Sequence, residues 1–453
     1  MKEVNLMSAT NGMEKNSRPA SPSLSFSRRD FVKTGAAAAA GFAFMSSGNF
    51  AYAGGAETLR YGLIGCGGRG TGAIANAVEA DPSVVLVAMG DLFEDHLDES
   101  TSKLTEEIGA AYQVPDESKF VGWDAFQHVI DSEVDVVILA TPPVFRPEHL
   151  RYAVDKGRHV FMEKPVAIDP VGARGVMDVG EIAAQKSLSI VAGTQRRHEK
   201  QYLETVGRIH DGMMGEVIAG QVYWNQGALW KIDRMPGWSD MEHHVRNWLY
   251  YTHLSGDHVV EQHIHNIDVA NWVLQANPVR AVGVGGRQAR VSPDYGYVYD
   301  HFAVDLEYPS GARILSMCRQ QEGAAPYVGE HFQGTEGTSN AASWIRGTNT
   351  FRFEGENRNP YVQEHADHIA SIRAGEPLNE VQRMAETNLA ALMVREAAYT
   401  GQEVTWDDIM ASTQNLTPPV WSFDEVPIFS AAVPGETDLN RNPWQDVEIR
   451  ASN

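Results

Sequence analysis

The chain has 453 residues, of which 43% are hydrophobic and 21% charged, and this balance suits a globular protein of two or three domains. Its formal net charge of −22 argues against nucleic acid and anionic membranes as partners, because both are polyanions, and we expect a small-molecule partner instead. The two cysteines, Cys66 and Cys318, exclude a disulfide framework and a cysteine-rich metal site, and we expect no bridge between them.

The first segment of the chain has the pattern of an export signal. Residues 27–33, SRRDFVK, place a twin arginine before a weakly apolar run that is too short to span a membrane. Ala51-Tyr52-Ala53 then offers a cleavage site of the A-x-A type. We therefore predict a twin-arginine signal peptide over residues 1–53 and a periplasmic protein.

Residues 54–192 alternate between predicted strands and helices. Apolar runs predict strands at 59–64, 84–91, 134–141, 159–165 and 188–195, and polar or amphipathic stretches predict helices at 71–80, 94–110 and 148–156. Near-continuous apolar runs such as VDVVILAT are typical of strands that a parallel sheet buries on both faces. We predict an α/β domain of the Rossmann type with a doubly wound parallel sheet.

The pattern changes after about residue 193. Strands with alternating polarity are predicted within 215–226, 279–291 and 301–320, and the last of these contains a Pro-Ser-Gly hairpin turn. Amphipathic helices are predicted at 363–374 and 382–399. These elements predict a second, α+β domain with an antiparallel sheet over residues 193–410. Residues 411–453 lack periodicity, and we predict an arm that lies on the surface or on a neighbouring subunit.

A glycine-rich loop follows the first predicted strand. Gly65, Gly67 and Gly70 form a G-x-G-x-x-G pattern between a predicted strand and a predicted helix, and Gly68 and Arg69 complete the loop. Such glycines allow a tight turn and a close approach of the backbone to a pyrophosphate at the helix N-terminus. In this context the loop predicts a dinucleotide site.

An acid at the end of the next predicted strand bears on which dinucleotide binds. Asp91 stands 26 residues after the first glycine of the loop, where a carboxylate accepts hydrogen bonds from the adenosine ribose hydroxyls. Because a carboxylate there repels a 2′-phosphate, NAD is favoured over NADP. Arg69 is the residue that argues for NADP.

Glu163-Lys164-Pro165 end the strand predicted at 159–165. Ligands bind at the carboxyl ends of parallel strands, and Pro165 restricts the backbone beside Lys164. A lysine held there can hydrogen-bond a substrate hydroxyl and stabilise a developing alkoxide. It could equally be a solvated charge at a strand end.

With these motifs, residues 58–405 resemble the Gfo/Idh/MocA family, the glucose–fructose oxidoreductase and inositol dehydrogenase family. The resemblance is carried by GCGGRG at 65–70, A-T-P at 140–142, G-R-H-V at 157–160 and E-K-P at 163–165. It implies a Rossmann domain followed by a domain built on a large, mostly antiparallel sheet. That sheet often serves as a subunit interface in the family, so we expect a homo-oligomer, a dimer or a tetramer.

The resemblance also implies an activity and several site residues. Members of the family commonly transfer a hydride between NAD(P) and a hydroxyl of a sugar or cyclitol. Thr141 and Pro142 would join the cofactor-binding residues, and Glu163 would lie beside the nicotinamide ribose. Pro143 departs from the asparagine that usually follows Thr-Pro in the family, so we expect a different contact near the nicotinamide.

The segment HVVEQHIHNID, residues 258–268, matches a further signature of the family. The signature histidine falls on His265, and Glu261 stands where the family has a shorter acid, aspartate. The resemblance implies that Lys164 and His265 are the acid/base groups, with Glu261 orienting the substrate or tuning His265.

The spacing inside this segment allows different interpretations. In a helix, Glu261, His265 and Asp268 share one face and His263 points away from it. In a strand, Glu261, His263 and His265 would align like a three-ligand metal site. The apolar spacing downstream favours a helix from about Glu261 and hence a catalytic Glu261/His265 pair with no metal. A metal site and structural histidines at a domain seam are the alternatives.

Several other residues are candidates for substrate binding, since aromatic faces stack on sugar C–H surfaces and Arg and Asn bind hydroxyls. Arg246, Asn247 and Trp248 belong to the sequence RNWLYY, and Arg196 follows the last Rossmann strand. We expect these four to bind substrate together with His265. Each of the four could instead pack at a domain seam or carry surface charge.

Three functions fit these observations, and we favour the first. It is a periplasmic, NAD(P)-dependent oxidoreductase that acts on a sugar, sugar derivative or cyclitol. Its cofactor would be loaded before export and stay bound, because the periplasm has no ready pool of nicotinamide cofactor. The second is a redox-neutral, NAD-dependent glycosidase that acts by transient oxidation at C3 and elimination. The third is a non-enzymatic, cofactor-bound sensor or assembly protein, against which the Lys164/His265 pair argues.

Overall fold

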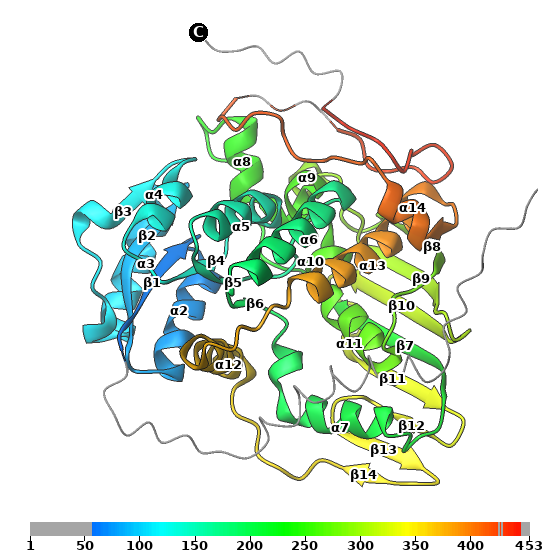
Figure 1. Cartoon of the computed structure of the whole chain (residues 1–453). Coiled ribbons are helices and arrows are strands. Elements are labelled where there is room, and N and C mark those ends of the chain that lie inside the picture. The colour runs from blue at the N-terminus through cyan, green and yellow to red at the C-terminus, as the bar shows by residue number, and fades with distance from the viewer. Residues whose placement is uncertain (1–56, 425, 427–428, 445–453) are drawn as a thin grey trace, which may run out of the picture. The chain divides into compact units, whose positions relative to one another are not determined.

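The computed structural model describes residues 57–424, 426 and 429–444, which are drawn in colour in Figure 1. The predicted signal peptide and its cleavage site lie outside these residues. Cys66 and Cys318 are both free and buried. In the part of the chain that is described, none of the helices combines the length and the apolar character needed to cross a membrane.

The first sheet is the predicted doubly wound parallel sheet. Its strand order is β3-β2-β1-β4-β5-β6, and all of its strand pairs are parallel. The strands are β1 (Leu59–Ile64), β2 (Val84–Asp91), β3 (Lys119–Val121), β4 (Val136–Leu139), β5 (His159–Met162) and β6 (Ile190–Ala192). The strand order reverses between β1 and β4, and ligands bind outside the carboxyl ends of the strands at such a switch point.

Helices pack on both faces of this sheet. They are α2 (Gly68–Ala80), α3 (Glu94–Glu107), α4 (Ala125–Asp131), α5 (Arg146–Asp155) and α6 (Pro170–Gln185). The start of α6 shows how local sequence sets such a boundary: Asp169 caps the helix by accepting from the backbone N–H of Gly172, and Pro170 takes the first helical position. A helix from much later in the chain, α12 (Pro360–Ala374), packs against α2.

The second sheet has nine strands in the order β14-β13-β12-β11-β7-β10-β9-β8-β15 and is mostly antiparallel, as expected. Its strands are β7 (Val217–Gln226), β8 (Arg280–Gly286), β9 (His301–Glu307), β10 (Arg313–Gln320), β11 (Tyr327–Gly334), β12 (Gly337–Ser339), β13 (Trp344–Gly347), β14 (Phe351–Arg352) and β15 (Val404–Thr405). The central pair, β7 and β10, is parallel. The turn predicted at Pro-Ser-Gly joins β9 to β10, which pair as a hairpin.

Helices bury one face of the second sheet, as the alternating burial along β9 and β10 indicates. The largest is α13 (Val381–Thr400), which packs against β8, β9 and α6. Figure 1 shows α6 and α13 between the two sheets. The remaining helices are α7 (Lys200–His210), α8 (Asp240–Arg246), α9 (Thr252–Ser255), α10 (His258–Glu261), α11 (Ile264–Leu274) and α14 (Trp406–Ala411).

The helix predicted from about Glu261 is instead divided there, because α10 ends at Glu261 and α11 begins at Ile264. The backbone carbonyl of Glu261 accepts a hydrogen bond from Lys164 Nζ at 2.6 Å. The backbone N–H of His265, which would bond that carbonyl in a continuous helix, bonds Gln262 O at 3.5 Å instead. A side chain from the first domain therefore interrupts the helix.

The described part of the arm lies on this same chain. After α14, Leu416 and Trp444 are buried in an apolar cluster with Phe93 and Phe145 of the first domain. Figure 1 shows the trace of the arm crossing from α14 towards α8.

Candidate active site at the carboxyl edge of the parallel sheet

The turn between β1 and α2 leaves room for an anion. A Cβ atom at Gly70 would lie 1.9 Å from Gly65 O, and one at Gly65 would lie 2.6 Å from the backbone of Thr141, so both glycines are needed for close packing. At Gly67 and Gly68, by contrast, no described atom lies within 4 Å of such a Cβ. No described side chain caps α2. The N–H groups at the start of α2 therefore face open space, and the cradle fits a pyrophosphate.

Asp91 is held rigidly at the end of β2. Its carboxylate accepts hydrogen bonds from the backbone N–H of Cys66 at 2.7 Å and of Phe93 at 2.9 Å. His96 Nδ1 lies 3.4 Å from the same carboxylate, which raises the pKa of the imidazole. Sequence reasoning missed His96, a group that can carry charge beside Asp91.

Arg69 points from the glycine loop towards the end of β5. Its guanidinium lies 2.6 Å from Glu163 Oε1 and 3.1 Å from Glu364 Oε1, and 4.9 Å from the centre of the Tyr361 ring. Burial, and then the charge of Glu163, raises the pKa of the Glu364 carboxyl well above its usual value. Glu364 and Tyr361 come from α12, far along the chain, and no local motif marks them as part of the site.

Lys164, Glu261 and His265 form a charged corner at the end of β5. Lys164 Nζ lies 2.9 Å from Glu261 Oε1, and both side chains are about nine-tenths buried, with 11% and 8% of their surface exposed. Glu261 Oε2 has no hydrogen-bond partner among the described residues. Burial, together with the charges of Lys164 and Arg196, lowers the pKa of His265 well below its usual value. The corner thus places a neutral imidazole near a lysine–carboxylate pair.

The second sheet supplies aromatic and polar groups next to this corner. The His265 ring stacks on Trp224 of β7, with ring centres 5.6 Å apart. The guanidinium of Arg196 lies 5.6 Å from the centre of the same indole and pairs with Glu330 of β11. Asn266 also donates to Glu330, at 2.6 Å. Of the expected substrate-binding residues, Arg196 is therefore brought to the corner, although its charge is already paired.

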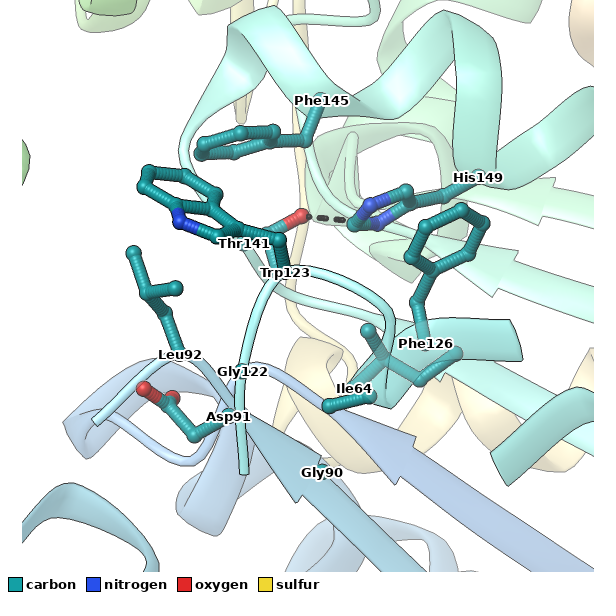
Figure 2. Close-up of a pocket in the computed structure, with 11 residues that line it drawn as sticks. Ile64, Gly90, Asp91, Leu92, Gly122, Trp123, Phe126, Thr141, Phe145 and His149 are labelled. Carbon is teal, nitrogen blue, oxygen red and sulfur yellow. Dashed lines mark hydrogen bonds between the residues drawn. The ribbon is translucent and has the colours of Figure 1, made fainter. Parts of the chain in front are cut away.

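A narrow pocket lies between the carboxyl ends of β1, β2 and β4 (Figure 2). Trp123, Phe126, Phe145 and His149 give it an aromatic lining, and Asp91 stands at its rim. Thr141 Oγ1 lies 3.4 Å from His149 Nδ1. Burial lowers the pKa of His149 to about 3, so this imidazole is neutral. The neutral aromatic lining beside an acid has the chemistry that suits a flat base with ribose hydroxyls.

Two family models match the chain. The oxidoreductase family with an NAD-binding Rossmann fold matches residues 59–193, and the GFO/IDH/MocA C-terminal domain matches residues 202–339. Together they span more than half of the chain. The chain belongs to the Gfo/Idh/MocA oxidoreductase family.

The names of curated relatives of this chain indicate more than one kind of reaction. It is 25% identical to the 2,7-anhydro-N-acetylneuraminate hydratase of Escherichia coli K12, over 55% of this chain and 62% of that protein. It is also 25% identical to a glycosyl hydrolase family 109 protein of Shewanella pealeana, over 65% of this chain and 62% of that protein. The inositol 2-dehydrogenase of Rhizobium meliloti is 24% identical over 57% of this chain and 68% of that protein. The chain thus spans about two thirds of the length of these relatives.

Solved structures of dehydrogenases share the fold of this chain. The scyllo-inositol dehydrogenase of Lactobacillus casei with NAD(H) and scyllo-inositol matches with a TM-score of 0.59 and 19% identity, over 77% of this chain and 99% of that one. A levoglucosan dehydrogenase in complex with NADH and levoglucosan gives a TM-score of 0.61 and 17% identity over the same shares of the two chains. At this identity the likeness concerns the fold alone.

Three residues expected to bind substrate lie elsewhere in this Gfo/Idh/MocA protein. Arg246 pairs with Asp95 at 2.9 Å and lies 3.8 Å from the centre of the Phe93 ring, beside the end of β2 rather than of β5. Asn247 is fully buried, and its amide is used by the backbone of Ile232 and Asp294. Trp248 packs edge-on against Trp230, with ring centres 5.9 Å apart.

The histidines of residues 258–268 have separate surroundings. His258 Nδ1 lies 3.0 Å from Asp257 Oδ1, and His263 Nε2 lies 2.9 Å from Ser316 Oγ on β10. Only His265 faces the corner at Lys164. Within the described ranges, no three groups of the metal-ligating kinds are placed to hold a metal ion. The three histidines therefore contact different residues, and their arrangement does not support the metal-site alternative.

Proposed function

We propose that this protein transfers a hydride between tightly held NAD(H) and a hydroxyl of a sugar, sugar derivative or cyclitol. One observation carries the proposal: the corner of Lys164, Glu261 and His265 lies at the same edge of the parallel sheet as the glycine cradle. The names of the inositol 2-dehydrogenase relative and of the levoglucosan dehydrogenase structure support this substrate class.

The side chains at the corner suit the proton transfers of this reaction. A bound nicotinamide would supply the hydride acceptor or donor. The Lys164 ammonium donates a hydrogen bond to the substrate oxygen and stabilises the charge that develops there. His265, kept neutral by its surroundings, accepts the hydroxyl proton. Glu261 holds Lys164 with one carboxylate oxygen, and its second, buried oxygen has no hydrogen-bond partner among the described residues.

Two contacts favour NAD over NADP within this proposal. The Asp91 carboxylate occupies the end of β2 and would repel a 2′-phosphate. Arg69, the cation that argued for NADP, is paired with Glu163 and Glu364 at the other side of the cradle. Binding of NADH at least ten-fold tighter than of NADPH would agree with this assignment, and the reverse order would contradict it.

A second candidate function is redox-neutral cleavage of a glycoside, with the hydride taken up and later returned. Several curated relatives favour it, since glycosyl hydrolase family 109 proteins of Shewanella pealeana, Porphyromonas gingivalis and Streptomyces coelicolor match at 25–26% identity. This chemistry needs a base for a carbon-bound proton, and Glu261 or His265 could remove it.

One experiment separates these candidates. The purified protein is incubated with a panel of glycosides, free sugars and cyclitols, with and without added NAD⁺. Net NADH with the glycosidic bond intact supports hydride transfer to the cofactor, whereas free sugar without net NADH supports redox-neutral cleavage. If neither product forms on a broad panel, both candidate reactions are contradicted and a binding or assembly role is favoured.

We also propose that the protein is exported to the periplasm through the twin-arginine pathway. The support is the SRRDFVK segment and the A-x-A site that follows it. Cell fractionation would find the wild type in the periplasm and the double variant Arg28→Lys, Arg29→Lys in the cytoplasm. An unchanged distribution would contradict the proposal.

Finally, we propose a homo-oligomer that associates through the outer face of the second sheet. Val282 and Val284 on β8 and Tyr327 on β11 are all more than two-fifths exposed. Such exposed apolar side chains on an ordered sheet are typical of a protein interface. Light scattering should give a multiple of the chain mass, and Val284→Lys should lower it.

A further inference from the structure

The arm is fixed to the rest of the protein on both sides of the segment 417–440. Before the crossing, the backbone N–H of Leu416 donates to Asp169 Oδ2 at 2.7 Å. After it, Arg441 Nη1 lies 2.6 Å from the buried Glu396 Oε2 of α13, and Trp444 Nε1 donates to Leu416 O at 2.7 Å. The two anchors lie close together, so the described residues between them are tethered to the protein on both sides.

Two aromatic residues of this loop lie against the aromatic pocket. The Trp421 ring is centred 4.4 Å from the Phe145 ring and 5.5 Å from the Trp123 ring. The Phe423 ring is centred 5.0 Å from Trp123 and 5.9 Å from Phe93. Trp123 and Phe145 form part of the pocket lining in Figure 2. Trp421 and Phe423 therefore pack on side chains of the pocket without themselves lining it.

We propose that Trp421 and Phe423 form a latch that holds the walls of the adenosine pocket closed, so that bound dinucleotide exchanges slowly. The inference rests on the proposed dinucleotide binding and adds how the cofactor is retained. Trp123 and Phe145 can move apart to release a base only if the latch lifts. Because the loop is anchored on both sides, lifting it breaks several aromatic contacts at once. Trp421 and Phe423 are positioning residues, since they act through the pocket walls.

The latch fits the chemistry of the pocket. Aromatic walls bind a flat base by stacking, and this stacking depends on the walls being fixed in place. His149 at the base of the pocket is stacked on Phe126, with ring centres 4.0 Å apart, so that wall is already rigid. Trp123 follows β3 on a short loop and has its other ring contacts with Trp421 and Phe423 of the arm. The arm thus supplies the rigidity that the loop after β3 lacks.

The release rate of NADH tests the latch. The full chain is loaded with NADH and mixed with a large excess of NAD⁺, and the loss of bound-NADH fluorescence is followed. Trp421→Ala should release NADH roughly ten-fold faster or more, since it removes two aromatic pairs, and Trp421→Phe should restore part of the loss. Phe423→Ala should have a smaller effect in the same direction. Val420→Ala, at an exposed neighbouring position, is the matched control and should release NADH at the wild-type rate.

Other outcomes would contradict the latch alone, or the latch together with dinucleotide binding. Equal release rates in the wild type and in folded Trp421→Ala, checked by circular dichroism, would overturn the latch and leave dinucleotide binding in place. Faster association in Trp421→Ala with unchanged release would mean that Trp421 obstructs the pocket, which contradicts the latch. A wild type that binds neither NADH nor NADPH would overturn the proposed function and the latch together.

Discussion

The two ends of the proposed cofactor site are built from different chemistry. At the end of β5, Lys164 and Glu261 form a buried ion pair, and Glu261 has a carboxylate oxygen without a partner among the described residues. At the ends of β2 and β4, Trp123 and Phe145 form an aromatic pocket. A buried ion pair adds little net stability, because desolvation offsets the attraction between the charges. We infer that the charged end is suited to the reaction and the aromatic end to retention of the cofactor.

Both ends hold a neutral imidazole, and this similarity makes the contrast testable. His149 is neutral because it is buried between aromatic rings. His265 is neutral through burial as well, with the nearby Lys164 and Arg196 charges adding to the effect. Only His265 lies where a substrate hydroxyl would meet Lys164.

The largest effect is expected from Lys164→Met. It removes the donor to the substrate oxygen and leaves Glu261 buried without its cation, so kcat should fall by about 10²- to 10⁴-fold while NADH still binds. Steady-state kinetics and fluorescence titration measure the two quantities. Lys103→Ala, which removes an exposed partner of Glu99, is the control and should leave both unchanged. A loss of less than about ten-fold in kcat, against the range expected for acid/base groups, would show that this end does not carry the chemistry.

The matched pair His265→Phe and His149→Phe compares the two ends directly. His265→Phe removes the proton acceptor and should lower kcat by roughly 10²-fold or more. His149→Phe keeps a flat aromatic ring in the pocket, so it should change the Kd for NADH and leave kcat within about two-fold, since it touches no reacting group. Similar kcat losses in both variants would remove the functional distinction between the ends.

Gly70→Ala tests the cradle between the two ends. The added Cβ would lie 1.9 Å from Gly65 O, so the β1–α2 turn must open, and the Kd for NADH should rise by about ten-fold or more, as the turn supplies the pyrophosphate contacts. Gly72→Ala is the control on the same helix, because no described atom lies within 4 Å of its new Cβ. Calorimetric titration of both variants provides the measurement. Equal affinities would mean that the cradle does not hold the dinucleotide.

Glu261→Asp installs the acid that the family usually carries. The shorter side chain cannot reach Lys164 Nζ at the present 2.9 Å, although the backbone carbonyl of residue 261 still accepts from that ammonium. We expect a loss of about ten-fold in kcat, smaller than for Lys164→Met, because lysine keeps one of its two partners. Glu330→Asp, which shortens an acid paired with Arg196, is a control for a general effect of shortening. An equal or higher kcat for Glu261→Asp would show that the longer acid is not adapted to this site.

The smallest effect expected from a single residue is on the pH dependence of the protein's stability. Burial lowers the pKa of His149, His244 and His263 to about 3 and of His368 to about 4, whereas the unfolded chain titrates near 6.5. Below about pH 6.5 the unfolded state binds more protons than the folded state, so the free energy of unfolding should fall as the pH falls from 6.5 towards 4. Thermal melts across this range measure it.

Thermal melts of one variant show how much of this dependence of Tm on pH comes from a single histidine. His149→Phe removes one of these titrations and should flatten the dependence of Tm on pH. A Tm that is constant between pH 6.5 and 4.5 would contradict the assignment of neutral buried histidines.

The parts of the fold that were predictable from sequence are those set by local pattern. β1 and β2 begin and end where their apolar runs begin and end, because a glycine cluster and Asp91 close them. The helix predicted at 382–399 is α13, Val381–Thr400. The break after Glu261 was not predictable, because its cause is a lysine almost a hundred residues earlier in the chain.

The candidate site likewise contains residues that short sequence motifs mark and residues that they do not. The glycine loop, Lys164 and His265 stand in short motifs, and the structure brings them to one edge of the parallel sheet. Glu364 and Trp421 join the site only through tertiary packing, and no local pattern marks them. Arg246 shows how packing adds contacts that a local pattern does not indicate, since it stands in an aromatic stretch and its guanidinium packs on Phe93, far from it in the sequence.

The anchored arm has a consequence for the order of events during synthesis. Residues 412–444 leave the ribosome after every residue that lines the adenosine pocket, and at ~5–20 residues per second they take roughly two to seven seconds to make. Throughout that interval the nascent chain presents a pocket whose walls are not yet latched. Dinucleotide that enters then is enclosed when Trp421 arrives, whereas a finished chain must open before it can load. Cofactor content would therefore record the dinucleotide concentration at the time and place of translation.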